Sequence, residues 1–285
     1  MSNGAGTIYL VATPIGNLED MTPRGTRILA EVDLIAAEDT RHSAPLLKHL
    51  GVRTPMVAYH EHNEDQKTPE LIEQVQAGKN IALISDAGTP LLSDPGFRLV
   101  AAAHQAGIVV SPVPGPCAAI AALSASGLAT NEFLFAGFPP PKQGARQHFF
   151  ERYAAYPQTL IFYESAHRIV DSIADMAAVF GGDRMAVVAR ELTKKFETIQ
   201  QDPLAELRRW VADDPNQQKG EFVVLVRGRA APTGGETIDP DTEKLLRLLA
   251  AELPPKKAAA IVAQVSGLGK NRLYQWLIEE RSGKE

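Results

Sequence analysis

The sequence predicts an α/β protein made of two α/β domains and a small C-terminal helical module. Short apolar runs rich in β-forming residues alternate with stretches whose apolar residues recur at helical spacing. A chain of 285 residues has room for about two domains. After residue 240 only helical periodicity is present. We therefore expect domains at 1–125 and 126–229, a linker at 230–240 and the helical module at 241–285.

The first domain opens with an apolar strand at 7–13, which Pro14 and Gly16 end, and a helix at 22–32. Four more strand and helix pairs follow, with strands at 33–37, 56–59, 81–85 and 109–113 and helices at 44–50, 69–77, 96–106 and 117–126. A parallel strand pair needs a crossover long enough to hold a helix, so this order predicts a mostly parallel sheet with helices on both faces. In such sheets the ligand crevice lies beyond the carboxyl ends of the strands.

The second domain contains predicted strands at 133–137, 159–163, 185–190, 198–200 and 221–226, and predicted helices at 143–155, 166–180 and 203–211. Alternation in 221–226 offers an apolar face for a homodimer. Two prolines and two glycines without apolar periodicity mark 230–240 as a linker. The helical module contains predicted helices at 241–252, 256–265 and 270–280.

Composition excludes several classes of protein. Hydrophobic residues make up 45% and charged residues 22% of the chain, which is ordinary for a globular protein. The single cysteine, Cys117, cannot form an intramolecular disulfide or a cysteine-based metal centre, which suits a reducing cytoplasm. No apolar run approaches the ~20 residues of a membrane helix, and no signal peptide is visible. A net charge of −5 argues against generic polyanion binding. We expect a cytoplasmic protein with no membrane partner.

Three loops that follow predicted strands carry glycine and proline, at 12–18, 85–96 and 113–123. Such loops let backbone amides approach a ligand, and Asp86 can accept from its hydroxyls or amine. Neither the dinucleotide-binding nor the P-loop glycine pattern is present, so no motif favours NAD or ATP. We expect Ser93 or Asp94 to cap the next helix. Cys117 lacks an activating base and is interpreted as a small wall residue rather than a nucleophile.

Acids and bases that could accept a proton gather in three short segments. These segments contain Glu38, Asp39, Arg41 and His42; His60, Glu61, His62 and Glu64; and Arg190, Glu191, Thr193 and Lys194. Structural alternatives remain open, since Asp39 can cap a helix, His60 can begin a turn and Glu191 can form a solvated pair with Arg190. The histidine spacing matches no standard zinc motif, so no metal is expected.

Six longer motifs together resemble a known family. They are Thr13-Pro-Ile-Gly-Asn-Leu18, Ala37-Glu-Asp-Thr-Arg-His42, Ser85-Asp-Ala-Gly-Thr-Pro90, Pro114-Gly-Pro-Cys117, Phe162-Tyr-Glu-Ser165 with His167-Arg168, and Ala189-Arg-Glu-Leu-Thr-Lys194. Over about residues 7–285 the chain resembles the tetrapyrrole methylase superfamily of class III S-adenosylmethionine-dependent methyltransferases, in its ribosomal RNA branch. The common Gly-Asp-Pro of the superfamily stands here as Ser85-Asp86-Ala87, which argues against methylation of a porphyrinoid ring.

The resemblance implies a fold and an activity. It implies two α/β domains of tetrapyrrole-methylase type with S-adenosylmethionine in the cleft between them, and 2′-O-methylation of a cytidine ribose in the decoding centre of 16S rRNA. The partners it implies are 16S rRNA or the small ribosomal subunit and a second copy of the chain, with no DNA. The cofactor-binding residues expected are Pro14, Ile15, Asp86, Gly88, Thr89, Cys117, Ala118 and Tyr163.

A ribose hydroxyl must lose its proton as the methyl bond forms, so we predict a proton acceptor among four residues. These are Glu38, Asp39, His60 and Glu191. Target phosphates are assigned to Arg41, Arg190 and Lys194, and in the C-terminal module to Lys256, Lys257, Lys270 and Arg272. From residue 254 to 281 five basic residues stand against two acidic ones, in a helix-turn-helix-like arrangement that is alternatively a plain packing module.

Two other functions stay open at this point. The same fold and cofactor would serve a methyltransferase of small tetrapyrroles. A non-catalytic regulator would instead sense a ligand with its α/β part and bind nucleic acid with its C-terminal module.

Overall fold

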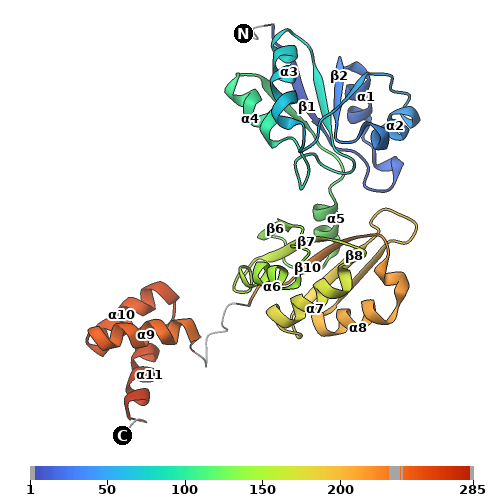
Figure 1. The fold of residues 1–285 in the computed structure, drawn as a ribbon. Coiled ribbons are helices and arrows are strands. Elements are labelled where there is room, and N and C mark those ends of the chain that lie inside the picture. Colours follow the sequence, from blue (N-terminus) through green and yellow to red (C-terminus); the bar gives the residue numbers. More distant parts are fainter. Residues whose placement is uncertain (1–3, 231–237, 239, 283–285) are drawn as a thin grey trace. The chain divides into compact units, whose positions relative to one another are not determined.

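The computed structural model describes residues 4–230, 238 and 240–282 and divides the chain into two compact units, Met1–Arg229 and Ala230–Glu285 (Figure 1). The predicted linker at 230–240 falls almost wholly outside the described residues. Each unit is described below by itself. No helix in the described part of the chain is long and apolar enough to cross a bilayer.

The first half of the larger unit is built on a five-stranded sheet with the order β3-β2-β4-β1-β5. Its strands are β1 (Thr7–Val11), β2 (Leu34–Ala37), β3 (Met56–Ala58), β4 (Ile81–Ile84) and β5 (Val109–Val113). Every pairing in the sheet is parallel, as predicted. The central position of β4 brings its carboxyl end beside that of β2.

Helices cover both faces of this sheet, which also confirms the prediction. They are α1 (Pro23–Glu31), α2 (Thr40–His49), α3 (Glu64–Gln76) and α4 (Phe97–Gln105), with a 3₁₀ turn η1 at Leu18–Asp20. Leu29 and Leu47 of α1 and α2 pack on one face, and Leu71 and Leu99 of α3 and α4 pack on the other. Strands buried on both faces need apolar residues at every position, which explains why β2 and β4 read as continuous apolar runs.

Two of these helices begin earlier than predicted. Both α2 and α3 start ahead of a proline, Pro45 and Pro69, that the sequence prediction placed at or near the helix start. In α2 the cause is the Asp39 side chain, which accepts a hydrogen bond from the Arg41 backbone N–H at 2.8 Å and so caps the helix ahead of Pro45. Asp39 is therefore a helix cap in the structure, which is the structural alternative left open by the sequence.

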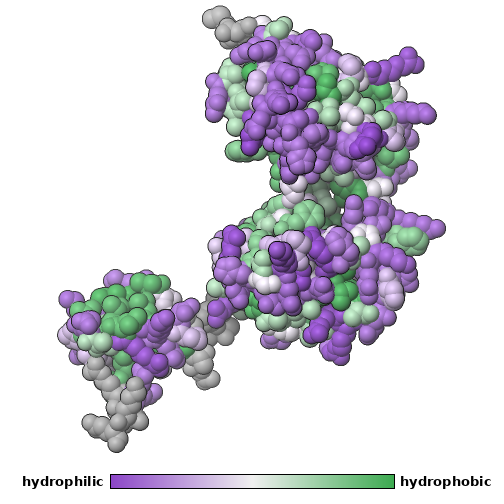
Figure 2. All heavy atoms as spheres, viewed as in Figure 1, coloured by the Kyte–Doolittle hydropathy of each residue, from purple (hydrophilic) through white to green (hydrophobic). Residues whose placement is uncertain are grey.

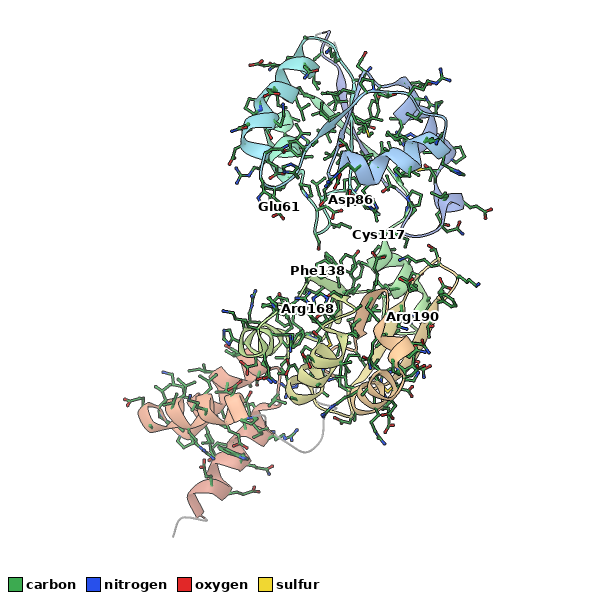
Figure 3. All side chains as sticks on the ribbon, turned by 45° about the vertical axis from the view of Figure 1, so that its right-hand side comes forward. Glu61, Asp86, Cys117, Phe138, Arg168 and Arg190 are labelled. Carbon is green, nitrogen blue, oxygen red and sulfur yellow. The ribbon has the colours of Figure 1, made fainter. Side chains whose placement is uncertain are left out.

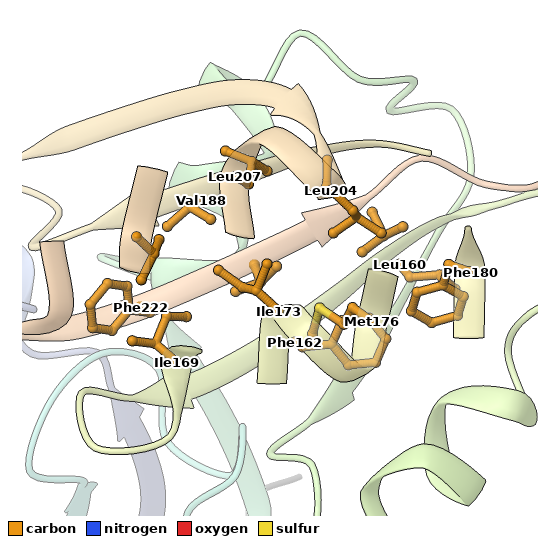
Figure 4. Packing of buried hydrophobic residues seen from close by; sticks show 14 of the residues in the cluster. Leu160, Phe162, Ile169, Ile173, Met176, Phe180, Val188, Leu204, Leu207 and Phe222 are labelled. Carbon is orange, nitrogen blue, oxygen red and sulfur yellow. The ribbon is translucent and has the colours of Figure 1, made fainter. Parts of the chain in front are cut away.

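The second half is built on a mixed sheet with the order β6-β7-β10-β8-β9. Its strands are β6 (Phe133–Gly137), β7 (Thr159–Ser165), β8 (Met185–Arg190), β9 (Thr198–Pro203) and β10 (Glu221–Val226). Only β6 and β7 run parallel. Helices α6 (Gln143–Glu151), α7 (Ile169–Phe180) and α8 (Leu204–Asp213) cover one face, where Phe162, Ile173 and Leu207 pack together (Figure 4), and η2 (Pro215–Gln218) follows α8.

Two predictions about this half are wrong. Strand β10 lies in the middle of the sheet, hydrogen-bonded to β7 and β8 and buried on both faces, so it offers no apolar face for a dimer. Helix α5 (Ala118–Ala125) packs through Ala119 and Leu123 on the other face of this second sheet. The border between the two halves therefore precedes α5 instead of following it at residue 125.

The C-terminal unit consists of three helices around a small core, as predicted. They are α9 (Pro240–Glu252), α10 (Pro255–Ser266) and α11 (Lys270–Ser282), and Leu246, Val262 and Leu273 are buried among them. Gly267 ends α10 in the left-handed region with φ 72°, a conformation that glycine adopts at low cost. The Arg247 guanidinium lies 5.3 Å from the ring centroid of Trp276, so this ring is partly covered within the unit itself.

Candidate active site

A cavity of about 410 Å³ lies where the carboxyl ends of the first sheet face the second sheet. Its size is typical of small-molecule sites. From the first half it is lined by Ile15, Glu38, Asp86, Gly88, Thr89, Leu92 and Asp94. From the second half it is lined by Ala118, Phe138, Tyr163, Ala189, Leu192 and Val223. On the face of the larger unit that Figure 2 shows, the surface is mostly polar, and apolar residues gather at the junction of its two halves.

Two carboxylates meet on the first wall because β2 and β4 are neighbours. The Asp86 backbone N–H donates to Glu38 Oε2 at 3.4 Å, and the Asp39 backbone N–H donates to Asp86 Oδ1 at 3.1 Å. Burial raises the pKa of Glu38, and the charge of Asp86 adds to the rise, although the hydrogen bond from the Asp86 backbone opposes it. Glu38 is therefore a stronger proton acceptor than an ordinary surface carboxylate.

Asp94 is a third carboxylate on this wall and was missed by the sequence prediction, which made it a helix cap. The N-cap of α4 is Gly96, with φ 131°, and its N–H donates to Glu64 Oε1 at 2.7 Å. Neither Ser93 nor Asp94 caps the helix, so that prediction is wrong. Pro95 and Gly96, which separate Asp94 from the helix, are the sequence signal that argued against it.

The environment of Asp94 is acidic. Burial raises the pKa of Asp94 to about 6, a hydrogen bond from Ser85 works against the rise, and the charges of Glu38 and Asp86 add to it. Three carboxyl groups thus share one wall of the cavity and favour a cationic ligand or a ligand rich in hydroxyl groups.

The three loops singled out in the sequence lie against one another. Backbone N–H groups of Thr13 and Gly88 donate to each other's carbonyls at 2.9 and 3.1 Å. The Thr89 hydroxyl donates to the Pro116 carbonyl at 3.0 Å, which ties in the third loop. Gly88 has φ 82°, and a Cβ there would stand 3.3 Å from Ile15 Cγ2, so both backbone shape and space favour glycine.

The second wall is largely apolar, although Glu164, Ser165 and Glu221 also line it, and it carries the phenol of Tyr163. The Tyr163 hydroxyl accepts a hydrogen bond from the Ala119 backbone N–H at 3.2 Å at the start of α5. Burial raises the pKa of Tyr163 to about 12, helped by the neighbouring Cys117. Cys117 itself packs in an apolar cluster with Ala118 and Tyr163, which agrees with its interpretation as a wall residue.

Six of the eight expected cofactor-binding residues line the cavity. They are Ile15, Asp86, Gly88, Thr89, Ala118 and Tyr163. The other two, Pro14 and Cys117, are not among the lining residues, although each is adjacent in sequence to one of them.

Of the four predicted proton acceptors only Glu38 lines the cavity. The hydrogen bonds from Arg41 hold the pKa of Asp39 far below its ordinary value. His60 begins a turn before α3, with its N–H donating to Asn63 Oδ1 at 2.8 Å. Burial acts to raise the pKa of Glu191, but the hydrogen bonds from Lys194 and the Glu221 backbone, together with the charges of Lys194 and Arg190, outweigh it and lower the pKa. Glu38 is the proton acceptor that the geometry favours.

The expected phosphate-binding residues differ in accessibility. The Arg41 side chain is 89% exposed and pairs with Asp39 at 2.7 Å. Arg190 is buried, and its guanidinium donates to the carbonyls of Lys219 and Phe196 at 3.2 and 3.0 Å, so it supports the loop after β8 rather than facing a phosphate. Lys194 bridges Glu191 and Glu221 at 2.9 and 2.8 Å.

The basic residues of the C-terminal unit lie in the first turns of two helices. Lys256 and Lys257 open α10, and Lys270 and Arg272 open α11. Cations at these positions are repelled by the positive end of the helix dipole, and a bound anion would offset this repulsion. Within residues 4–230, 238 and 240–282 no group of three or more His, Cys, Asp or Glu side chains is arranged to hold a metal ion.

Comparison with known proteins decides the family. A model described as Tetrapyrrole (Corrin/Porphyrin) Methylases matches residues 7–208, and one described as the RsmI C-terminal HTH domain matches residues 236–281. The chain belongs to the tetrapyrrole methylase family. Within this family, the chain is similar to proteins named ribosomal RNA small subunit methyltransferase I. That of Pseudomonas aeruginosa is 56% identical over 98% of this chain and 99% of the relative, and that of Escherichia coli O157:H7 is 51% identical over 98% and 97%.

Several solved structures share the fold at low sequence identity. A diphthine synthase matches with a TM-score of 0.61 and 15% identity, covering 78% of this chain and 90% of that one. A uroporphyrin-III C-methyltransferase from Thermus thermophilus complexed with S-adenosylhomocysteine matches with a TM-score of 0.54 and 18% identity, covering 77% and 97%. The fold class implied by the sequence resemblance is therefore confirmed.

Proposed function

We propose that this chain is an S-adenosylmethionine-dependent methyltransferase of the small-subunit ribosomal RNA, and that it methylates the ribose 2′-hydroxyl of a cytidine in the decoding centre of 16S rRNA. The observation that carries the proposal is the similarity to ribosomal RNA small subunit methyltransferase I over nearly the full length of both chains. The cavity, which has both carboxylates and apolar residues in its lining, is a suitable place for methyl transfer from S-adenosylmethionine.

The cavity fits S-adenosylmethionine in its size and in the chemistry of its walls. Carboxylates of Glu38, Asp86 and Asp94 match the cationic and hydroxyl-bearing parts of this cofactor. The apolar surface formed by Ala118, Ala189 and Val223 matches its planar ring. When bound, S-adenosylmethionine supplies a methyl group attached to a positively charged sulfur.

The residues of the chain then have two tasks in the reaction. They hold the acceptor hydroxyl in line with the methyl group, and they remove its proton as the new carbon–oxygen bond forms. Glu38 is placed to receive that proton, since its carboxylate lines the cavity and has a raised pKa. Asp86 keeps the Glu38 side chain in place through its backbone N–H.

Methylation of a small tetrapyrrole is the second candidate. It draws support from the family name and from the fold shared with uroporphyrin methyltransferases. The motif at Ser85 and the presence of a separate helical unit with exposed Lys256 and Lys257 favour RNA instead.

An rRNA substrate also agrees with a cytoplasmic location. The homodimer stays a proposal that rests on the resemblance alone, and light scattering at micromolar concentration tests it.

One experiment tests the activity. The protein is incubated with methyl-labelled S-adenosylmethionine and, in separate reactions, with 30S particles, free 16S rRNA or tetrapyrrole precursors, and any labelled nucleotide is mapped. We expect label on a cytidine ribose in 30S particles or 16S rRNA. Label on a tetrapyrrole, or on a base instead of a ribose, would contradict the proposal.

A further inference from the structure

One aromatic side chain at the cavity is neither part of the apolar core nor explained by the proposed cofactor contacts. Phe138 lines the cavity and is 50% exposed. It follows strand β6, on the edge of the second half that faces Asp86 (Figure 3). Large apolar side chains are normally buried, so a half-exposed phenylalanine at a cavity calls for an explanation.

The backbone sets the direction of this ring. The register between β6 and β7 shifts between Phe135 and Gly137, and Gly137 has φ 69°. Such a β-bulge redirects the side chains that follow it and is often found beside functional sites. The Ser93 hydroxyl packs against Gly137, at 3.3 Å from where a Cβ would stand, which brings the loop that carries Leu92 beside Phe138.

A partly buried ion pair between Arg168 and Glu164 fixes the loop after β6. Arg168 donates from Nη1 to the Pro139 carbonyl at 3.1 Å and from Nε to Ser165 Oγ at 2.9 Å. Its Nη2 lies 2.9 Å from Glu164 Oε1, and the Glu164 side chain is fully buried. Pro139, the residue after Phe138, is thus held by a guanidinium that two further contacts, to Ser165 and Glu164, hold in place.

The ring is supported on one side and open on another. Tyr163 meets Phe138 edge to face, with ring centroids 5.5 Å apart and an angle of 61° between the rings. Leu92, which is 38% exposed, lines the same cavity from the first half. Phe138 and Leu92 therefore present apolar surface at the solvent-facing part of the cavity, where a flat ring can be held.

The deep and exposed parts of the cavity suit different ligands. Ala189 and Val223 are almost completely buried and form an interior wall for the cofactor. With the cofactor bound, a cavity of about 410 Å³ has no room for an RNA chain, so the target nucleotide must approach from the solvent-facing part. The base must then lie near the half-exposed residues.

We propose that Phe138 stacks on the nucleobase of the target nucleotide and that Arg168 is the residue that positions it. This proposal rests on the RNA methyltransferase function proposed above. Proteins that recognise single-stranded RNA commonly stack unpaired bases on aromatic side chains. Stacking on the base fixes its ribose, so Phe138 orients the 2′-hydroxyl toward Glu38 without contacting the reacting atoms.

The test compares Phe138→Ala with wild type in two assays, binding of S-adenosylmethionine by calorimetry and single-turnover methylation over a range of 30S concentrations. We expect the half-saturating 30S concentration to rise by about tenfold, in keeping with the loss of one base–aromatic stack. We expect the cofactor affinity to stay within about twofold. Phe138→Trp should restore the 30S dependence. Phe133→Ala is the matched control, since Phe133 is 43% exposed at the opposite end of β6.

Arg168→Lys tests the positioning role and keeps a positive charge beside Glu164. We expect it to raise the half-saturating 30S concentration severalfold, and to add nothing when combined with Phe138→Ala, because both changes remove the same stack. Additive effects would show that Arg168 has only a structural role.

Other outcomes overturn the proposal. A loss of cofactor affinity in Phe138→Ala with an unchanged 30S dependence would mean that the ring contacts the cofactor. No change in either assay would mean that the ring has no binding role. Absence of 30S methylation by the wild-type protein would instead refute the proposed function, and this result is separate from any effect of Phe138.

Discussion

Lys194 lies directly over Gly16, and this contact joins the two halves of the larger unit. A Cβ built on Gly16 would stand 2.4 Å from Lys194 Cγ. The Lys194 ammonium meanwhile bridges Glu191 and Glu221, of which Glu221 lines the cavity. Glycine at position 16 thus allows a side chain of the second half to lie against the first loop of the sheet.

Gly16→Ala should displace Lys194 and weaken both of its ion pairs. Partly exposed pairs are worth ~0–1 kcal/mol each, so we expect a melting temperature lower by roughly 2–4 °C. Thermal unfolding measures the shift. Gly144→Ala is the control, because nothing lies within 4 Å of a Cβ there. Equal melting temperatures for Gly16→Ala and wild type would contradict the packing described.

Asp86→Ala should weaken S-adenosylmethionine binding by about tenfold or more, since hydrogen bonds to a charged group contribute ~1.5–3 kcal/mol. Isothermal calorimetry on the folded variant measures the effect. Asp33 stands at the amino end of β2, away from the cavity, and Asp33→Ala is expected to bind the cofactor normally. Unchanged affinity in Asp86→Ala would place the cofactor elsewhere.

Glu38→Gln should slow single-turnover methylation by about 100-fold or more, with S-adenosylmethionine and RNA both saturating. Asp39→Asn, His60→Ala and Glu191→Gln should each retain far more activity, because none of these side chains lines the cavity. In wild type the rate should fall as the pH drops through the raised pKa of Glu38, since only the carboxylate accepts a proton. A wild-type rate for Glu38→Gln would reject this assignment.

Asp94→Asn should stabilise the protein at neutral pH. The pKa of Asp94 is raised to about 6 from its ordinary 3.8, chiefly by burial, so the folded state loses stability as the pH rises from about 4 to about 6 and does not regain it above. Asparagine removes the charge and retains an oxygen that can accept from Ser85. We expect the variant to melt higher than wild type at pH 7.5 and equally at pH 4. The opposite pH trend would contradict the raised pKa.

Removal of residues 241–285 should leave S-adenosylmethionine binding intact and weaken RNA binding. The C-terminal helices form a unit with their own core, and Lys256, Lys257, Lys270 and Arg272 go with them. The slope of log affinity against log salt should become shallower by about 0.7 for each phosphate of single-stranded RNA that the truncated protein no longer binds. Equal RNA affinity with and without these residues would exclude a binding role for them.

Local periodicity was enough to predict the order of elements. Apolar spacing is a property of a few consecutive residues, so the strands, the parallel first sheet and the three C-terminal helices could all be inferred. The convergence of the three loops that follow β1, β4 and β5 could also be inferred, because the carboxyl ends of parallel strands share one edge of a sheet.

The features that were predicted wrongly depend on contacts between distant residues. The position of β10 between β7 and β8 is set by its pairings with these two strands, and the pattern of apolar residues within β10 does not indicate which strands are its neighbours. The burial of Arg190 depends on its hydrogen bonds to the carbonyls of Lys219 and Phe196. The sequence around Arg190 does not predict these contacts. Asp is a common cap residue, which favours Asp94 from sequence, whereas the N-cap of α4 is Gly96, whose N–H donates to Glu64 of α3.

All five strands of the parallel sheet precede all five strands of the mixed sheet in the chain, and within residues 4–230 the backbone passes from one sheet to the other once, between Val113 and Ala118. The acidic wall and the aromatic edge of the cavity therefore come from two consecutive stretches of the chain. An exchange of sequence near residue 115 would replace one wall by that of a relative and would divide only the apolar cluster in which Ile15 packs against the second half. In a family that methylates such different acceptors, this arrangement lets the edge that meets the acceptor evolve independently of the acidic one.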